Sequence, residues 1–406
     1  MKIRSERRVV ITGLGLVSSL GSTTETTWRG VLNGECGIRD VTRFDTTAYP
    51  SRRAAELSES IVTDLAIRAG QPLSLLDLIA VSAFREALAD SRLAIDPAIP
   101  SGLVFGGGSG SFVPVESELI FSDVISQDSG EPHPDLYNPA SPAEQIRSMH
   151  PGLSRQLVPM TACSSASVAI GFAFDAVRTG MWEVAFAGGA DVISRLCFGG
   201  FNTLRAMDPD CCKPFDRRRI GMSLGEGAGV LVLESLEHAR ARRARIHAEL
   251  IGYGLTSDAF HMTTPDATGR SWARCLSTAL SASRCLPESV HYINAHGTGT
   301  PLNDSAETAA VHLAFGAHAD RIGISSTKSM LGHCQFSAGA VEAVITVLAV
   351  RDQIMPPTMH LESPDPLCDL DYVAHSARPA TIDVAGSSSF GFGGSSVMLL
   401  FRRVES

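Results

Sequence analysis

The chain of 406 residues lacks the features that mark several specialised classes of protein. It has no apolar run as long as a membrane span, so we expect no membrane partner. It has no block of like charge, and its net charge of -9 argues against general binding to nucleic acid. What is present is typical of a folded globular chain: 44% of the residues are hydrophobic and 19% are charged. The length suffices for two domains or one large layered unit.

The nine cysteines contain no C-x-x-C pair, the spacing of many zinc and redox sites, and we expect no metal. Their odd number favours a reducing compartment, so we predict a cytoplasmic protein. The basic and then apolar beginning, MKIRSERRVVITGLGLVSSLG, has the outline of a signal peptide. Because Gly13 and Gly15 interrupt it and no A-x-A site follows, we interpret it as a core strand at 9–12 followed by a glycine turn.

Short β-rich runs that end in glycine alternate with helical patterns along the whole chain. This alternation predicts an α/β fold with a largely parallel sheet. Apolar residues at helical spacing predict one helix over 164–179, with Gly180 as its C-terminal cap, and a second over 337–353. The β-rich runs lie at 9–15, 102–110, 183–191 and 291–299.

The arginine-rich segment 238–249 is interpreted as a solvated helix that leads into a strand, because glutamates flank it. It also marks a midpoint, since strand-and-glycine patterns occur on both sides of residue 250. We therefore expect two similarly built halves, residues 1–250 and residues 251–406.

Cys163, in TACSSASVAI at 161–170, stands immediately before the first predicted helix. There, unpaired amides and the helix dipole can lower the pKa of a thiol below its usual value of about 8.5. The same amides could bind the oxyanion that forms when a thioester carbonyl is attacked. A cysteine before a buried helix is more often a packed core thiol, so the pattern alone leaves both readings open.

Three further stretches favour a chemical role. His296 follows a strand in NAHGTGTPLND, at 294–304. Lys328 and His333 lie in STKSMLGHCQFSAGAVEAV, at 326–344, just ahead of a helix that carries Glu342. Phe392 is flanked by glycines before the last strand, in SSSFGFGGSSVMLLF at 387–401. Taken singly, each could be a turn, surface or core residue.

With these stretches the chain resembles the elongating (type I/II) β-ketoacyl-acyl-carrier-protein synthases of the thiolase-like superfamily. The resemblance runs from VVITGLGLVSSLG to SFGFGG and passes through TACSSAS, AGGAD, KPFDRRRIGMSLGEGAGVLVLE, HGTGTP and STKSMLGH. It implies a five-layer αβαβα sandwich of two similar halves, the first carrying the cysteine and the second the histidines and the lysine. It also implies a homodimer, or a heterodimer with a subunit like a chain-length factor.

The resemblance further implies a decarboxylative Claisen condensation with an acyl carrier protein as partner. Cys163 would accept the acyl group, and His296 and His333 would bind the malonyl thioester and stabilise its enolate. Lys328, paired with Glu342, would set the electrostatics of the histidines. No tightly bound cofactor is implied beyond the phosphopantetheine arm of the carrier.

Family roles extend to residues around this centre. The backbone amides of Cys163 and Phe392 would form the oxyanion hole, and the Phe392 side chain would gate the acyl pocket. Thr298 and Thr300 match positions that contact the phosphopantetheine arm. The second histidine, His333, indicates the Cys-His-His elongating type rather than the Cys-His-Asn initiating type.

Several positions depart from the housekeeping fatty-acid pattern. Phe336 replaces a glycine, Ile220-Gly221-Met222 replaces Asp-Gly-Phe, and Ser109 stands where a larger apolar residue usually borders the acyl pocket. These departures favour a dedicated pathway of polyketide or aryl-polyene type. Housekeeping fatty-acid elongation and a non-catalytic chain-length partner are the alternatives.

The basic surface for an acidic carrier is thin. Arg205 matches a docking position, and Arg68 is the one positive residue between 56 and 84. Lys213, with Arg217–Arg219, could supplement them. Steering of a carrier depends on such a local field rather than on net charge.

Overall fold

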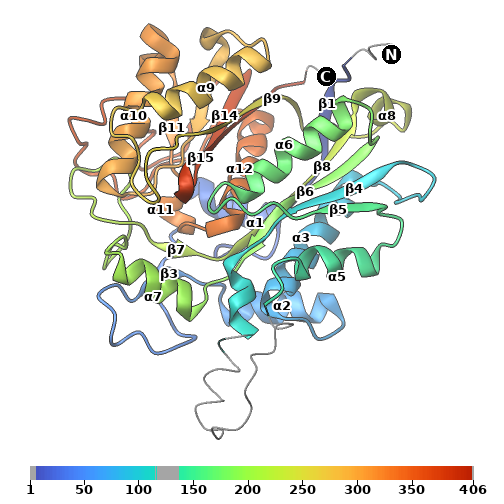
Figure 1. Cartoon of the computed structure of the whole chain (residues 1–406), viewed down its shortest axis with the longest axis horizontal. Coiled ribbons are helices and arrows are strands. Elements are labelled where there is room, and N and C mark those ends of the chain that lie inside the picture. The colour runs from blue at the N-terminus through green and yellow to red at the C-terminus, as the bar shows by residue number, and fades with distance from the viewer. Residues whose placement is uncertain (1–5, 115, 117–136, 405–406) are drawn as a thin grey trace, which may run out of the picture.

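The computed structural model describes residues 6–114, 116 and 137–404. Its centre is a mixed sheet of ten strands in the order β11-β10-β14-β15-β9-β1-β8-β6-β4-β5 (Figure 1). The strands are β1 (Val9–Ser18), β4 (Ser101–Gly106), β5 (Arg155–Leu157), β6 (Val184–Asp191), β8 (Gly227–Ser235), β9 (Ala248–Ser257), β10 (Val290–Asn294), β11 (Gly323–Ser325), β14 (Val384–Phe390) and β15 (Ser395–Arg402).

The sheet consists of two sets of strands with the same pairing pattern. In the first set β4 is parallel to β5 and β6, and β8 is antiparallel to β6 and β1. In the second set β10 is parallel to β11 and β14, and β15 is antiparallel to β14 and β9. An antiparallel contact between β1 and β9 joins the two sets. The prediction of a largely parallel sheet is therefore wrong, because each set closes with antiparallel strands.

The halves predicted at residues 1–250 and 251–406 have counterparts in these two sets. β9, the first strand of the second set, begins at Ala248. The division of the chain at residue 250 stays a prediction.

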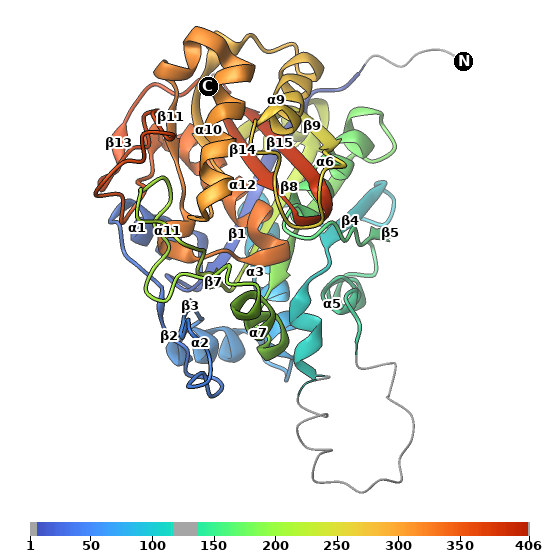
Figure 2. The same cartoon turned by 60° about the vertical axis from the view of Figure 1, so that its left-hand side comes forward.

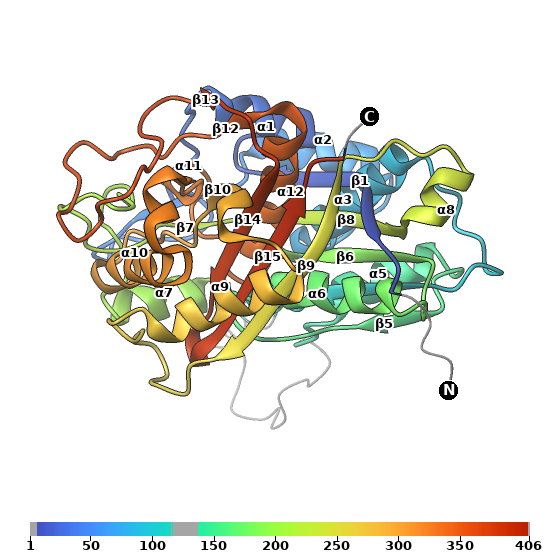
Figure 3. The same ribbon diagram turned by 90° about the horizontal axis from the view of Figure 1, so that it is seen from above.

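Helices form three layers around the two sets of strands. α3 (Leu75–Ser91) covers β1 and β8 on one outer face, and α9 (Arg270–Ala282) covers β9 and β15 on the other (Figure 3). Between the sets lie α6 (Ser165–Arg178) and α12 (Ala338–Asp352), which pack against each other. The result is the expected five-layer αβαβα sandwich of two similar halves.

The remaining helices and strands lie around this framework. They comprise the helices α1 (Thr24–Leu32), α2 (Glu59–Ala69), α5 (Ser141–Met149), α7 (Arg195–Thr203), α8 (Leu236–Ala241), α10 (Pro301–Phe315) and α11 (Lys328–Leu331), and the strands β2 (Arg39–Asp40), β3 (Arg53–Ala55), β7 (Leu224–Gly225), β12 (Ile354–Met355) and β13 (Arg378–Pro379). Figure 2 shows α7 beside the small β2–β3–β7 sheet at one end of the molecule. No helix in the described ranges is long and apolar enough to cross a membrane.

Both predicted core helices are confirmed, as α6 and α12. Gly180 has φ 76 directly after the end of α6, as a C-terminal cap requires. All residues of α12 from Ala338 to Val350 are buried, which is typical of a helix that is apolar on every side. The arginine-rich segment is confirmed only in part: α8 ends at Ala241, and a non-helical stretch at 242–247 leads into β9.

The predicted strand at 9–12 is confirmed, but the glycine turn after it is wrong, because β1 continues to Ser18. Gly13 and Gly15 serve packing instead. A Cβ on Gly15 would lie 1.9 Å from the Ala83 carbonyl oxygen, and one on Gly13 would lie 2.2 Å from that of Ala87. The two glycines thus let α3 approach the sheet closely.

Candidate active site

Cys163 lies on a sharp turn that leads into α6. The turn depends on Ala162, whose φ of 51 places a non-glycine residue in the left-handed region. Two hydroxyls hold it: Ser164 Oγ donates to the Thr161 carbonyl oxygen at 2.8 Å, and Ser165 Oγ donates to that of Ala162 at 2.7 Å. The turn directs the Cys163 side chain, which is 9% exposed, into a cavity.

Burial dominates the electrostatics of Cys163 and raises the pKa of its thiol to about 11. The positive charge of Lys328 and the backbone amides of Phe392 and Cys163 act in the opposite direction. In the free chain, desolvation therefore outweighs the lowering of the Cys163 pKa that is expected at a helix terminus. The two amides that reach the sulfur are those that the family pattern assigns to the oxyanion hole.

His296 follows β10, and its backbone is held by a buried carboxylate. The His296 amide donates to Glu307 Oε1 at 2.9 Å and to Ser388 Oγ at 3.0 Å, while the Gly297 amide donates to Glu307 Oε2 at 2.8 Å. Sequence reasoning missed Glu307. The sequence offers one signal for it: Glu307 lies one helical turn after Asp304 on α10, and this helix begins directly after the loop that contains His296.

His333 follows α11 and faces His296. Their rings are 5.3 Å apart between centroids and perpendicular. Among the described residues, neither ring nitrogen of His333 has a hydrogen-bond partner, and the same holds for Nδ1 of His296. Burial, reinforced by the charge of Lys328, holds the pKa of both imidazoles well below 6.5. At neutral pH both histidines are therefore neutral, with ring nitrogens available to a ligand.

Lys328 and Glu342 form an ion pair inside the protein, and their exposed fractions are 1% and 3%. Lys328 Nζ donates to Glu342 Oε1. Burial raises the pKa of Glu342 to about 7, and the neighbouring ammonium group limits this rise. The positive charge of Lys328 lowers the pKa of Cys163 and of both histidines. One charge therefore favours both the thiolate and the neutral imidazoles.

The cavity has a volume of about 330 Å³ and brings most of the predicted residues together. Its lining includes Cys163, His296, His333, Phe392, Thr298, Thr300 and Arg205. The hydroxyls of Thr298 and Thr300 are 3.0 Å apart, and Arg205 is exposed. Ile220, one of the departures from the family pattern, also lines the cavity and is 55% exposed.

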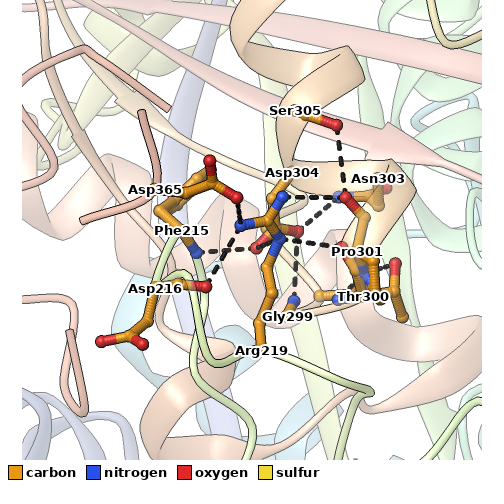
Figure 4. A network of polar contacts seen from close by, with 12 residues as sticks. Phe215, Asp216, Arg219, Gly299, Thr300, Pro301, Asn303, Asp304, Ser305 and Asp365 are labelled. Carbon is orange, nitrogen blue, oxygen red and sulfur yellow. Dashed lines mark hydrogen bonds and ion pairs between the residues drawn. The ribbon is translucent and has the colours of Figure 1, made fainter. Parts of the chain in front are cut away.

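Arg219 ties the loop of Thr298 and Thr300 to the loop that contains Ile220 (Figure 4). Its guanidinium donates to the carbonyl oxygens of Thr300 and Pro301, at 3.3 and 2.8 Å, and to Asp365. Asp304 adds a second link, since it accepts from the amides of Phe215 at 2.7 Å and Gly299 at 3.1 Å. The suggestion that Arg219 supplements a docking surface is wrong, because its side chain is only 4% exposed.

Three other predicted residues lie elsewhere. Ser109 is buried, and its hydroxyl contacts Asp191 at 3.1 Å and Gln335 at 2.8 Å. Lys213 is paired with Asp208 at 3.1 Å, and Arg68, on α2, is paired with Asp64 at 2.6 Å. Partners thus compensate the positive charges of Lys213 and Arg68.

A two-halved αβαβα sandwich with a cysteine and two histidines in one cavity is the architecture of thiolase-type condensing enzymes. Residues 6–239 match the family described as beta-ketoacyl synthase, N-terminal domain, and residues 247–362 match beta-ketoacyl synthase, C-terminal domain. The chain belongs to the β-ketoacyl synthase family, and its class of reaction is that of a condensing acyltransferase.

Individual relatives agree with this assignment. The 3-oxoacyl-(acyl-carrier-protein) synthase 2 of Synechocystis sp. is 39% identical over 98% of this chain and 99% of its own. The enzyme of the same name from Coxiella burnetii is 39% identical with the same coverage. Among solved structures, a beta-ketoacyl synthase from Burkholderia phymatum is 34% identical with a TM-score of 0.87, over 98% of this chain and 100% of its own. The ishigamide ketosynthase/chain length factor is 33% identical with a TM-score of 0.88, over 99% of this chain and 100% of its own.

Proposed function

We propose that Cys163 is the nucleophile that receives the acyl group from an acyl carrier protein. Its sulfur attacks the thioester carbonyl, a new carbon–sulfur bond forms, and the thiol of the carrier's phosphopantetheine arm leaves with the proton lost by Cys163. The amides of Cys163 and Phe392 would bind the oxyanion of this step, and their reach to the sulfur supports this role.

His296 and His333 then act on the malonyl thioester. Its bond to the carboxylate breaks, carbon dioxide leaves, and the electron pair enters an enolate whose oxygen accepts hydrogen bonds from the imidazoles. The enolate carbon attacks the acyl carbonyl, and the bond to the Cys163 sulfur breaks. The products are a β-ketoacyl carrier and a Cys163 thiolate, which takes up a proton. Neutral imidazoles suit this role because they donate hydrogen bonds without adding negative charge.

The observation that carries this proposal is the shared cavity. It holds a buried thiol that two backbone amides reach, together with two neutral histidines. Both ring nitrogens of His333 and Nδ1 of His296 lack partners among the described residues. Lys328, through its pair with Glu342, acts as a positioning residue for them.

Intact-protein mass spectrometry after incubation with an acyl carrier thioester tests the assignment. We expect one acyl adduct per chain, located on Cys163 by peptide mapping, and none on Cys163→Ala. Cys285→Ala is the matched control, because that thiol is also buried but lies outside the cavity. An equal adduct on Cys163→Ala would show that another residue is the nucleophile.

We also propose where the carrier approaches. Thr298 and Thr300 line the cavity, where their hydroxyls would contact the phosphopantetheine arm. Arg205 is exposed at the same cavity and would attract the acidic surface of the carrier. In this proposal no tightly bound cofactor takes part and the protein acts in the cytoplasm. The solved complex of a type II polyketide synthase carrier with its ketosynthase, 29% identical with a TM-score of 0.88, supports this mode of partnership.

The pathway we propose is a dedicated one of polyketide or aryl-polyene type rather than housekeeping elongation. Support comes from Phe336, Ile220 and Ser109, which depart from the fatty-acid pattern, and from the ketosynthases among the solved structures. Mass spectrometry of the acyl group trapped on Cys163 in the native cell would decide this point. A saturated fatty acyl chain would favour housekeeping elongation.

A second chain would cover the open edge of the sheet at β5. β5 is the last strand in the described sheet, and Leu157 at its end and Met160 just after it are 50% and 45% exposed. An open edge bordered by apolar side chains favours pairing with another sheet. We therefore propose a dimer through this edge. Light scattering of the protein expressed alone distinguishes a homodimer from a subunit that needs a different partner.

A further inference from the structure

A second cluster of reactive side chains lies outside the cavity. Cys36, Cys211 and His360 each place one candidate ligand atom so that all three atoms are within 4.8 Å of one another. The residues come from three distant segments: the loop after α1, the loop before β7 and the loop after β12. This separation in sequence explains why motif spacing predicts no metal site here.

The side chains of the cluster face one another, and the Cys36 thiol interacts with both Cys211 and His360. Both cysteines are free thiols. Nε2 of His360 is buried and has no hydrogen-bond partner within the part of the chain that the structure describes. Cys36 and His360 are only half-buried, so an ion can reach the cluster from solvent.

Two thiols and one imidazole form a soft donor set without a carboxylate. Such a set favours zinc over magnesium or calcium, which bind through oxygen ligands. Zinc binds thiolate sulfur at about 2.3 Å and imidazole nitrogen at about 2.0–2.1 Å in tetrahedral geometry, so small side-chain movements bring the three atoms around one ion. A water molecule can supply the fourth ligand, as in other sites with three protein ligands.

The cluster also borders the helix that carries Lys328. The Gly37 amide, next to Cys36, donates to the Met330 carbonyl oxygen at 2.8 Å. The Met359 amide, next to His360, donates to Ser329 Oγ at 2.9 Å. Cys212, next to Cys211, donates through its thiol to the Lys328 carbonyl oxygen at 3.2 Å. Each candidate ligand is thus adjacent to a residue that binds α11.

We propose that Cys36, Cys211 and His360 form a zinc site that fastens three loops around α11. The site is distinct from the cavity and supplies no group to the condensation. Its effect is to stabilise the helix that positions Lys328 and leads to His333.

Cobalt titration of the full-length protein tests this site without any acyl substrate. The reduced protein is first stripped with a chelator and then titrated with Co²⁺ as a spectroscopic substitute for zinc. We expect one Co²⁺ per chain, with intense visible bands of tetrahedral cobalt and a thiolate-to-cobalt charge-transfer band, and displacement by zinc.

Substitutions assign the ligands. Cys36→Ser, Cys211→Ser and His360→Asn should each weaken metal binding by at least about 100-fold, more than the loss of an outer-shell partner. Cys285→Ser should bind like wild type; it is the matched control because Cys211 and Cys285 are both 7% exposed. Zinc should also raise the midpoint of thermal unfolding of the wild type but not that of Cys211→Ser.

The proposal would be overturned if the reduced wild type shows no cobalt band, or if the bands persist in Cys36→Ser and Cys211→Ser. It would also be overturned if Cys36 and Cys211 form a disulfide as readily with zinc present as without it. If a variant fails to fold, X-ray absorption spectroscopy of the zinc-loaded wild type replaces that measurement. We expect two sulfur ligands on the zinc, and a spectrum without sulfur ligands would contradict the proposal. Failure of the zinc site leaves the acyl adduct on Cys163 unaffected, so the two proposals fail separately.

Discussion

At the scale of single residues, burial sets the chemistry of the site. It raises the pKa of the Cys163 thiol and lowers the pKa of His296 and His333, so all three groups are neutral in the free chain. Neutral groups around the sulfur suit an apolar acyl chain, and a protonated thiol avoids a permanently reactive thiolate. The amides at Cys163 and the charge of Lys328 favour the thiolate once the thioester occupies the cavity.

The raised pKa predicts slow alkylation of Cys163. With a pKa of about 11, only about one thiol in a thousand is ionised at pH 8, so the rate should rise about tenfold per pH unit up to pH 10. Peptide mapping after timed iodoacetamide treatment measures this rate at Cys163 alone, with a small free thiol as reference. A plateau below pH 8 would mean that the thiol is activated in the free enzyme.

Ser109 is the residue through which we expect chain length to be set. Its hydroxyl lies beside the Cys197 thiol, where it opposes the rise in that thiol's pKa caused by burial. Cys197 is one turn from Phe201 on α7, and the Phe201 ring is 6.0 Å from that of Phe392. A chain of contacts through Cys197 and Phe201 therefore links Ser109 to Phe392.

Ser109→Leu should shift the products towards shorter acyl chains, because the larger side chain would displace Cys197 and Phe201 towards the cavity that Phe392 lines. Ser109→Ala is the matched control, since it removes the hydroxyl without adding volume. Mass spectrometry of the carrier-bound products gives the chain-length distribution. An unchanged distribution in Ser109→Leu, in a protein that still condenses, would place the end of the acyl pocket elsewhere.

At the scale of elements, the site depends on turns and loops that hydrogen bonds fix in place. Ala162 is held in the left-handed region before α6, Glu307 holds the backbone of His296 and Gly297, and Arg219 joins the loops on either side of the cavity entrance. These contacts explain how residues from distant segments keep one geometry.

Substitution of Arg219 tests the link between these loops. Arg219→Met leaves Asp304 and Asp365 without their cation, and loss of one partner of a buried ion pair costs about 3–5 kcal/mol. The midpoint of urea unfolding should fall accordingly. The exposed neighbour Arg217 provides the control, because Arg217→Met should change stability by less than about 0.5 kcal/mol. Equal midpoints for both variants would contradict the buried link.

The sequence predicted much of the fold and of the site, and its failures have physical causes. The helices after Cys163 and His333 were predictable because their apolar residues recur at helical spacing. The strand β1 was predicted too short, because the sequence alone does not distinguish a glycine that ends a strand from a glycine that lets a helix pack closely against it. Glu307 and Arg219 were missed as supports because their partners, which are backbone groups and side chains from distant segments, come close to them only in the folded chain.

At the scale of the whole molecule, the candidate active site forms where the two halves meet. The first half contributes Cys163 at the start of α6, and the second contributes the histidines and Lys328 near α11 and α12. α6 and α12 pack against each other between the two sets of strands, which brings the groups into one cavity. Docking of the carrier then depends on the surface around the entrance.

Arg205 is the basic residue on which we expect carrier docking to depend. Arg205→Glu should raise the KM for the acyl carrier protein about tenfold or more, because it replaces attraction to an acidic partner by repulsion. The kcat/KM for a small acyl thioester without a carrier should stay unchanged. Arg68→Glu serves for comparison, since Asp64 already compensates Arg68. An equal loss with the small thioester would point to damage in the cavity rather than to docking.

The most direct test of the account is a single turnover of the enzyme with the acyl group already on Cys163. After isolation of this acyl-enzyme, an excess of malonyl carrier is added, and carbon dioxide and the carrier-bound product are measured together. We predict one carbon dioxide and one β-ketoacyl carrier for each acyl group that leaves Cys163. Transfer of the intact acyl group to the added carrier without release of carbon dioxide would contradict the decarboxylative condensation.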